Sequence, residues 1–434
     1  MSTQGLSLEQ SPPLVVPLRF FLTGPLFGLL AAAAIAWGGA DAFGSRWAPS
    51  ILAATHLVTL GFLTMVMSGA LLQVLPVIVG AAVPRPRLTA AAVHLPLAAG
   101  TLALAVGLGI GAPGLLQLGL ALLAAALGVL LASASYALWR APADNAVVTA
   151  MRLALAALLA TSLLGLTLAA ALARGWALPL VVLTDLHLQW GLIGWVGLLV
   201  AGVAIHVVPM FQTTPGYPVN LMRWMARLTF AALSLITVAA VAAPDGAIHD
   251  WTRIGLAVMA AAFASVTLYL QSRRRRRQPD ATLTLWRTGM ASLLAAVAVW
   301  AAGRLLPDCA QAPVHGLVLG ILMVGGFAVS VVNGMLYKIA PFLAWLAMQN
   351  AAHGLALPPN VKRILPDPWM QRQARLHLLA LALLLGAAIW PQALVYPAAA
   401  AYAASSAFLW RNIAHVYRVH RRFVHTLNDA MAAQ

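Results

Sequence analysis

The strongest constraint on this chain is an internal repeat. The string Gly-x-x-x-polar-x-x-Pro occurs three times, at residues 69–76, 202–209 and 334–341. The prolines that end these strings lie 133 and 132 residues apart (209 − 76 and 341 − 209). Because self-similarity at a fixed period indicates repeated structural units, each unit spans about a third of the chain and must contain several helices.

The repeat extends upstream of each string. A glycine and an aromatic residue stand 15 and 14 residues before each proline, at 61–62, 194–195 and 326–327. Further upstream, each copy has one histidine, which is His56, His187 or His315. Close helix packing and helix termination explain the glycines and prolines, but packing does not explain an imidazole in each copy.

The composition places the chain in a lipid bilayer, since 62% of its residues are hydrophobic and only 8% are charged. A membrane-spanning helix needs roughly 20 mainly apolar residues. Twelve segments meet that requirement: 18–38, 51–80, 88–111, 114–139, 148–173, 178–209, 221–242, 252–271, 284–304, 314–346, 374–391 and 393–413.

These segments predict an all-α polytopic membrane protein whose twelve transmembrane helices form three pseudo-repeated four-helix units. The units cover about 18–140, 148–272 and 284–413, between an N-terminal tail at 1–17 and a basic tail at 414–434. Four helices per unit differs from the six-plus-six organisation of common permeases.

Basic residues in the loops predict the orientation. Loops after even-numbered segments are rich in arginine, including the run 273–277, and the other loops hold only isolated basic residues. By the positive-inside rule both termini are cytoplasmic, in a multi-pass protein of a bacterial-type inner membrane. This asymmetry and lipid headgroups account for the net charge of +16, so no nucleic-acid partner is expected.

The three motif helices then all enter from the outer face, which places their histidines in the outer third of the membrane. From His187 to the proline that follows is roughly 33 Å of helix. Gln73, His206 and Lys338 are therefore expected to form a polar cluster at the cytoplasmic end, where the Lys338 ammonium could equally reach the interface alone.

The inventory of reactive side chains is short. Neutral imidazoles at one depth suit haem iron or copper, and the alternative is interfacial histidines bonded to carbonyls or water. The single cysteine, Cys309, excludes an internal disulfide and thiolate metal sites. Asp185 is expected to be the only carboxylate close to the hydrocarbon, so proton relays through buried acids are not predicted.

Two of the repeated segments, 55–62 (THLVTLGF) and 187–195 (HLQWGLIGW), give the chain a family resemblance. Together with the twelve helices they resemble subunit I of the haem–copper oxidases and nitric oxide reductases, including degenerate relatives such as the NnrS family. The resemblance implies that His56 and His315 bind haem b, and that His187 takes the place of a copper ligand. It also implies nitric oxide or respiratory redox handling, with a respiratory enzyme or an electron donor as partner.

The chain departs from that family in ways that leave oxidoreductase activity open. Segment 221–242 lacks a His-His pair, segment 314–346 has one histidine instead of two, and Glu9 is the only glutamate. His315 also lies six residues further from its proline than His56, so a shared haem requires that segment 314–346 be displaced or locally irregular near 325–326. A cofactor-free permease or an accessory subunit of a respiratory enzyme remain alternatives.

Overall fold

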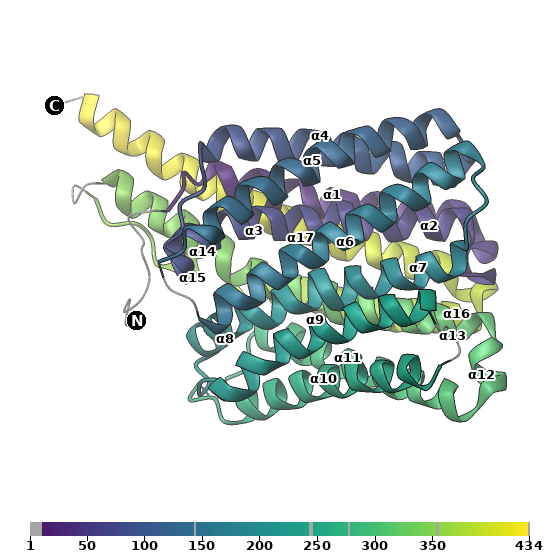
Figure 1. The fold of residues 1–434 in the computed structure, drawn as a ribbon. Helices are drawn as coiled ribbons and strands as arrows, with labels where there is room; N and C mark the ends of the chain where they lie inside the picture. The colour runs from purple at the N-terminus through teal and green to yellow at the C-terminus, as the bar shows by residue number, and fades with distance from the viewer. Residues whose placement is uncertain (1–10, 143–144, 243–245, 277, 353–355, 433–434) are drawn as a thin grey trace.

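The structure is a computed structural model that describes residues 11–142, 145–242, 246–276, 278–352 and 356–432. All regular elements in these ranges are helices, and they run roughly parallel through one bundle (Figure 1). Twelve of the helical stretches are long and apolar enough to cross a membrane. The predicted all-α polytopic membrane fold is therefore confirmed.

The first unit contains four spans, of which the second is broken into several helical segments. The first span is α1 with a short 3₁₀ turn, the second runs from α2 to η4, and α4 and α5 complete the unit. The bounds are α1 Val15–Gly38, η2 Gly39–Gly44, α2 Pro49–His56, η3 Leu57–Thr64, α3 Met65–Val74, η4 Leu75–Val79, α4 Pro86–Ile110 and α5 Pro113–Trp139.

The second unit repeats this order in a simpler form. A long helix comes first, the motif span follows in three segments, and two further helices end the unit. The bounds are α6 Ala146–Arg174, α7 Leu180–Gln189, η5 Trp190–Gly197, α8 Leu198–Gln212, α9 Val219–Ala242 and α10 Ala247–Ser272.

The third unit has the same order with two short extra helices, α12 and α15, in its loops. Its last helix continues without a break through the predicted basic tail, so the boundary expected at 413–414 is not an end of secondary structure. The bounds are α11 Ala281–Leu305, α12 Pro307–Gln311, α13 Pro313–Gly320, η6 Ile321–Val329, α14 Ser330–Ala352, α15 Val361–Ile364, α16 Asp367–Ile389 and α17 Pro391–Ala432.

The three units close into a ring. The last helix of each unit packs against the first helix of the next: α5 against α6, α10 against α11, and α17 back against α1. In Figure 1 the purple first helix and the yellow last helix accordingly lie next to each other. The repeat in the sequence is thus a pseudo-threefold arrangement in space, with the motif spans on the inside.

Each motif span contains a π-helical segment at the same place relative to its proline. The segments η3, η5 and η6 are π-helical and hold the recurring glycine–aromatic pairs. They also meet, since η6 contacts both η3 and η5, and the Trp195 indole N–H lies 3.4 Å from Thr64 Oγ1. Single-turn π segments interrupt helices mostly where function requires it.

The recurring glycines are explained by packing. A methyl group added at any of them would collide with the first helix of the same unit, so only glycine allows the two helices to approach this closely. The contacts are Gly61 with Phe27, Gly69 with Phe20, Gly194 with Ala157, Gly202 with Ala150, Gly326 with Ser292, and Gly334 with Trp286.

The sequence had suggested that the recurring prolines end helices, but not all of them do. Pro209 lies inside α8, three residues before its last residue, Gln212, and Pro341 lies well inside α14, which continues to Ala352. A proline inside a membrane helix is tolerated when neighbouring groups satisfy the freed carbonyls. The tenth span is consequently longer than the predicted 314–346.

Candidate functional site

The bundle has two chemically different ends. We call the end where α1 begins and α17 ends the arginine end, because Arg140, Arg274 and Arg276 lie there, and the opposite one the histidine end. The motif spans enter at the histidine end with α2, α7 and α13. All three predicted histidines are on these entry helices, at one end of the bundle.

His56 and His187 come together. Their ring centroids are 6.3 Å apart, and the planes of the two rings differ by 21°. Two imidazoles that bind one metal ion from opposite sides have centroids roughly 6 Å apart, given metal–nitrogen bonds of about 2 Å. The separation of this pair therefore matches that of two ligands of one metal.

In each of the two rings, one nitrogen is hydrogen-bonded and the other is available to bind a metal. His56 Nδ1 donates to the Leu52 carbonyl at 2.8 Å, and His187 Nδ1 donates to the Thr161 carbonyl at 3.0 Å. Within the described residues Nε2 of neither ring has a hydrogen-bond partner. Metal-ligating histidines commonly donate their second ring N–H to a backbone carbonyl, which fixes the tautomer and the ring orientation.

The entry helices are more exposed than the middle of the bundle. Only Leu186 is buried in α7 and only Leu317 in α13, whereas nearly all of α3 is buried. His56 and His187 are both half-buried. The two imidazoles therefore lie at the edge of the packed core and not inside it.

His315, predicted to share a haem with His56, has a different neighbour. Its ring lies against α11, where a methyl group on Gly303 would be 2.5 Å from His315 Cε1. The irregularity expected near 325–326 exists as η6, but η3 and η5 are π-helical as well. It therefore does not remove the six-residue offset between His315 and His56.

An ion pair bridges the entry helices above the imidazoles. Arg46, in the loop before α2, donates to Asp185 on α7 at 2.9 Å. The Arg46 side chain also passes Gly316 of α13, whose added methyl group would be 3.5 Å from Arg46 Cδ. Asp185, the one membrane-near carboxylate expected from the sequence, thus helps to hold the three entry helices together.

Among the described residues, no hydrogen bond or ion pair joins Gln73, His206 and Lys338, which were predicted to form a polar cluster. Gln73 donates to Ser11 at 2.7 Å, His206 is exposed, and Lys338 pairs with Asp280 at 3.0 Å. The expectation that Asp185 is the only carboxylate near the hydrocarbon was also wrong. Asp280 is 8% exposed at the start of α11, where it pairs with a lysine of α14.

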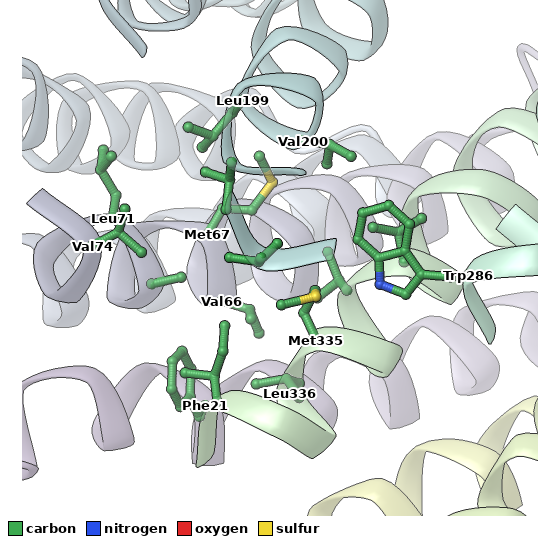
Figure 2. Close-up of a pocket in the computed structure, with 16 residues that line it drawn as sticks. Phe21, Val66, Met67, Leu71, Val74, Leu199, Val200, Trp286, Met335 and Leu336 are labelled. Atoms are coloured by element: carbon green, nitrogen blue, oxygen red, sulfur yellow. The ribbon is translucent and has the colours of Figure 1, made fainter. Parts of the chain in front are cut away.

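A central cavity lies between the motif spans, nearer the arginine end. Its volume is about 80 Å³, and its walls are the apolar side chains of α3, α8 and α14, closed by Phe21 and Trp286 (Figure 2). Trp286 Nε1 is buried there and has no acceptor. The cavity has space for a small apolar solute, but it is too small for a macrocycle.

The third unit buries a polar network that the sequence gave no reason to expect. The Tyr337 hydroxyl donates to Gln373 Oε1 at 2.9 Å and receives a hydrogen bond from Asn412 Nδ2 at 3.1 Å. Nearby, Ser330 and His377 are bonded at 2.7 Å, and His377 is only 1% exposed. His377 is thus buried inside the third unit.

Two features of the histidine end are compatible with a haem. The centroid separation of His56 and His187 is that of two imidazoles on one metal, and both Nδ1 atoms are bonded to backbone carbonyls. The described residues contain no group of three or more His, Cys, Asp or Glu side chains suited to a metal ion.

Comparison with protein-family models gives no match, and comparison with curated proteins gives none either.

Proposed function

We propose that this chain is a haem-binding membrane protein in which His56 and His187 would hold one haem b. The observation that carries the proposal is the 6.3 Å separation of the two rings, together with the backbone bonds at Nδ1. The pairing differs from the one that the family resemblance implied, because His187 takes the role expected of His315.

The number of imidazole ligands determines which reaction a bound haem could support. A haem held by two imidazoles would supply one-electron transfer. The residues of the chain hold the ligands: the carbonyls of Leu52 and Thr161 keep the Nδ1 protons, so that each Nε2 is an acceptor. Electron transfer within nitric oxide or respiratory metabolism, with a redox protein as partner, is the role we propose.

The test is an optical spectrum of the purified, detergent-solubilised protein with an assay for iron and copper. We expect a Soret band with low-spin character and about one iron per chain. His56→Ala and His187→Ala should each reduce haem content, and His315→Ala is the matched control that should retain it. A colourless protein, or a spectrum that neither of the first two variants alters, would overturn the proposal.

A second candidate, a cofactor-free permease, is favoured by the central cavity between the three motif spans. It requires passage of a small apolar solute along the pseudo-threefold axis. Filling the cavity by Val203→Phe would then stop transport, whereas the spectrum of a haem protein would not change. The His56–His187 pair has no role in this alternative, which is why we rank it second.

A further inference from the structure

The arginine run after α10 is folded onto the bundle. Arg275 N donates to the Thr213 carbonyl at 2.9 Å, and Arg276 N lies 3.3 Å from Thr213 Oγ1. Thr213 itself ends α8 with a φ of 55°, which turns the chain sharply at that point. The arginines are therefore presented on a defined backbone and do not project from a free loop.

The single carboxylate in this region is fully used. Asp280 Oδ2 accepts from Lys338 at 3.0 Å and from Arg276 at 3.3 Å, and Oδ1 accepts from Leu283 N at 2.9 Å. Burial by itself would raise the pKa of the Asp280 carboxyl, but Lys338, the Leu283 N–H and Arg276 together hold that pKa below its usual value.

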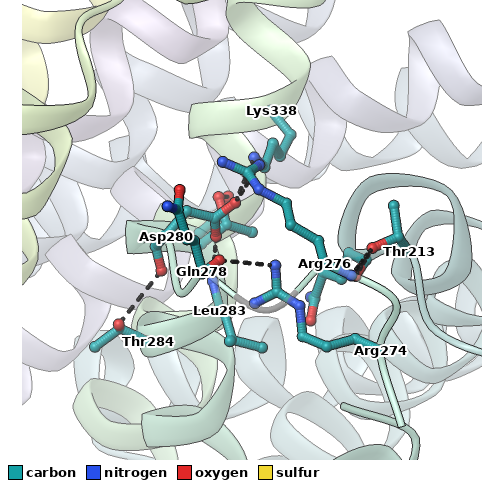
Figure 3. Close-up of polar contacts among 11 residues, drawn as sticks. Thr213, Arg274, Arg276, Gln278, Asp280, Leu283, Thr284 and Lys338 are labelled. Atoms are coloured by element: carbon teal, nitrogen blue, oxygen red, sulfur yellow. Dashed lines mark hydrogen bonds and ion pairs between the residues drawn. The ribbon is translucent and has the colours of Figure 1, made fainter. Parts of the chain in front are cut away.

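Arg274 is left without an anion. Its Nη2 donates to the Gln278 carbonyl at 3.2 Å, whereas Nε and Nη1 are buried and have no acceptor among the residues that the structure describes. Figure 3 shows its guanidinium group beside Gln278, with Arg276 and Lys338 directed toward Asp280. A charged donor that is shielded from water and lacks an acceptor is unfavourable, so this arrangement favours an added acceptor.

The local charge supports the same conclusion. Among the described residues, the cations Arg274, Arg276, Arg287 and Lys338 interact electrostatically within a group that includes the carboxylate of Asp280, so positive charge is in excess there. Burial lowers the pKa of the Arg274 guanidinium. The neighbouring charges of Arg276 and Arg287 lower this pKa further, whereas the Asp280 carboxylate raises it. An anion that neutralises the cluster would relieve this mutual repulsion.

We propose that the arginine end binds a phosphate group through Arg274, between the loop after α10 and the start of α11. A guanidinium group binds phosphate through parallel N–H···O bonds, which an ammonium cannot do. The loop directly follows a membrane span, so it lies at headgroup depth, where basic pockets between helices bind anionic lipids. The phosphate can belong to such a lipid or be free in solution.

The experiment compares the thermal unfolding of the full chain in three settings: zwitterionic phosphatidylcholine nanodiscs, the same nanodiscs with inorganic phosphate, and nanodiscs that contain phosphatidylglycerol. Binding to the folded state raises the unfolding temperature, by about 3 °C or more when the site is saturated. Arg274→Gln should abolish this rise. Arg273→Gln, an exposed neighbour with the same charge change, should keep it.

Arg274→Lys is the second variant, because it retains the charge and loses the planar donor set. It should keep less than half of the rise. A rise with phosphatidylglycerol alone identifies a lipid headgroup as the ligand, and a rise with inorganic phosphate as well identifies a free phosphate. Equal losses in Arg273→Gln and Arg274→Gln, or no rise in the wild type, would show that only diffuse attraction operates and would overturn the proposal.

Discussion

The imidazole of His187 lies over Gly165, where an added methyl group would be 2.8 Å from its Cε1. The third unit repeats this relationship with His315 and Gly303. In both units, a glycine on the first helix makes room for the histidine of the motif span. Substitution of either glycine by alanine would therefore displace the neighbouring imidazole while the histidine itself is unchanged.

Gly165→Ala should shift the His187 ring and lower the haem content, or alter the Soret band, because the imidazole cannot keep its position. Overpacking of this kind also costs about 1–3 kcal/mol of stability. Gly303→Ala is the matched control, since it displaces His315 and should leave the spectrum unchanged. The reverse result would assign the ligand role to His315. The measurement is the optical spectrum of purified Gly165→Ala and of purified Gly303→Ala.

The fold could be predicted from the sequence because hydropathy and the repeat are properties of the chain itself. Twelve apolar segments and three equal spacings require no knowledge of the packing. The π segments were not predicted, since η3, η5 and η6 have the composition of ordinary membrane helices. Their regular position became visible only when the three spans were compared in space.

The site was predicted only in part. The sequence placed His56, His187 and His315 at one end, as observed, but it could not show which two rings meet. The relative positions of helices from different units decide that. Asp280 was missed for a related reason: it follows a run of arginines and looks like a loop residue, and only the position of Lys338 on α14 shows that it is buried and paired.

Asp280→Asn should destabilise the protein by about 2 kcal/mol, because Lys338 is left partly buried without a counter-ion while asparagine still caps α11. The folded-state pKa of Asp280 is lowered, so its stabilising contribution is complete above its unfolded value of about 4. That contribution is lost as the pH falls through the lowered pKa. The free energies of unfolding of the wild type and of Asp280→Asn, measured from pH 7 downward, should therefore become equal in acid. A gap that is constant with pH would contradict this account.

Asp185→Asn should lower the free energy of unfolding by less than Asp280→Asn does, by below about 1 kcal/mol, because surface ion pairs contribute little to stability. The side chains of Arg46 and Asp185 are 36% and 34% exposed, against 20% and 8% for Lys338 and Asp280. Asp250→Asn, which breaks the exposed pair with Arg304, is the comparison and should behave alike. Added salt should reduce both effects. Thermal unfolding in detergent would rank the three variants, and a larger loss for Asp185→Asn than for Asp280→Asn would refute the order.

Tyr337→Phe should be more damaging than its small change in volume suggests. The hydroxyl is bonded to both Gln373 and Asn412, and all three side chains are at most 2% exposed. Its removal leaves the buried Gln373 Oε1 acceptor unpaired, at about 1–3 kcal/mol, and takes one of two acceptors from Asn412 Nδ2, which still donates to the Trp369 carbonyl at 3.3 Å. The double variant Tyr337→Phe/Asn412→Leu removes this weakened donor, so it should lose less than the sum of the single variants. Additive losses in thermal unfolding would mean that the two residues do not act as one network.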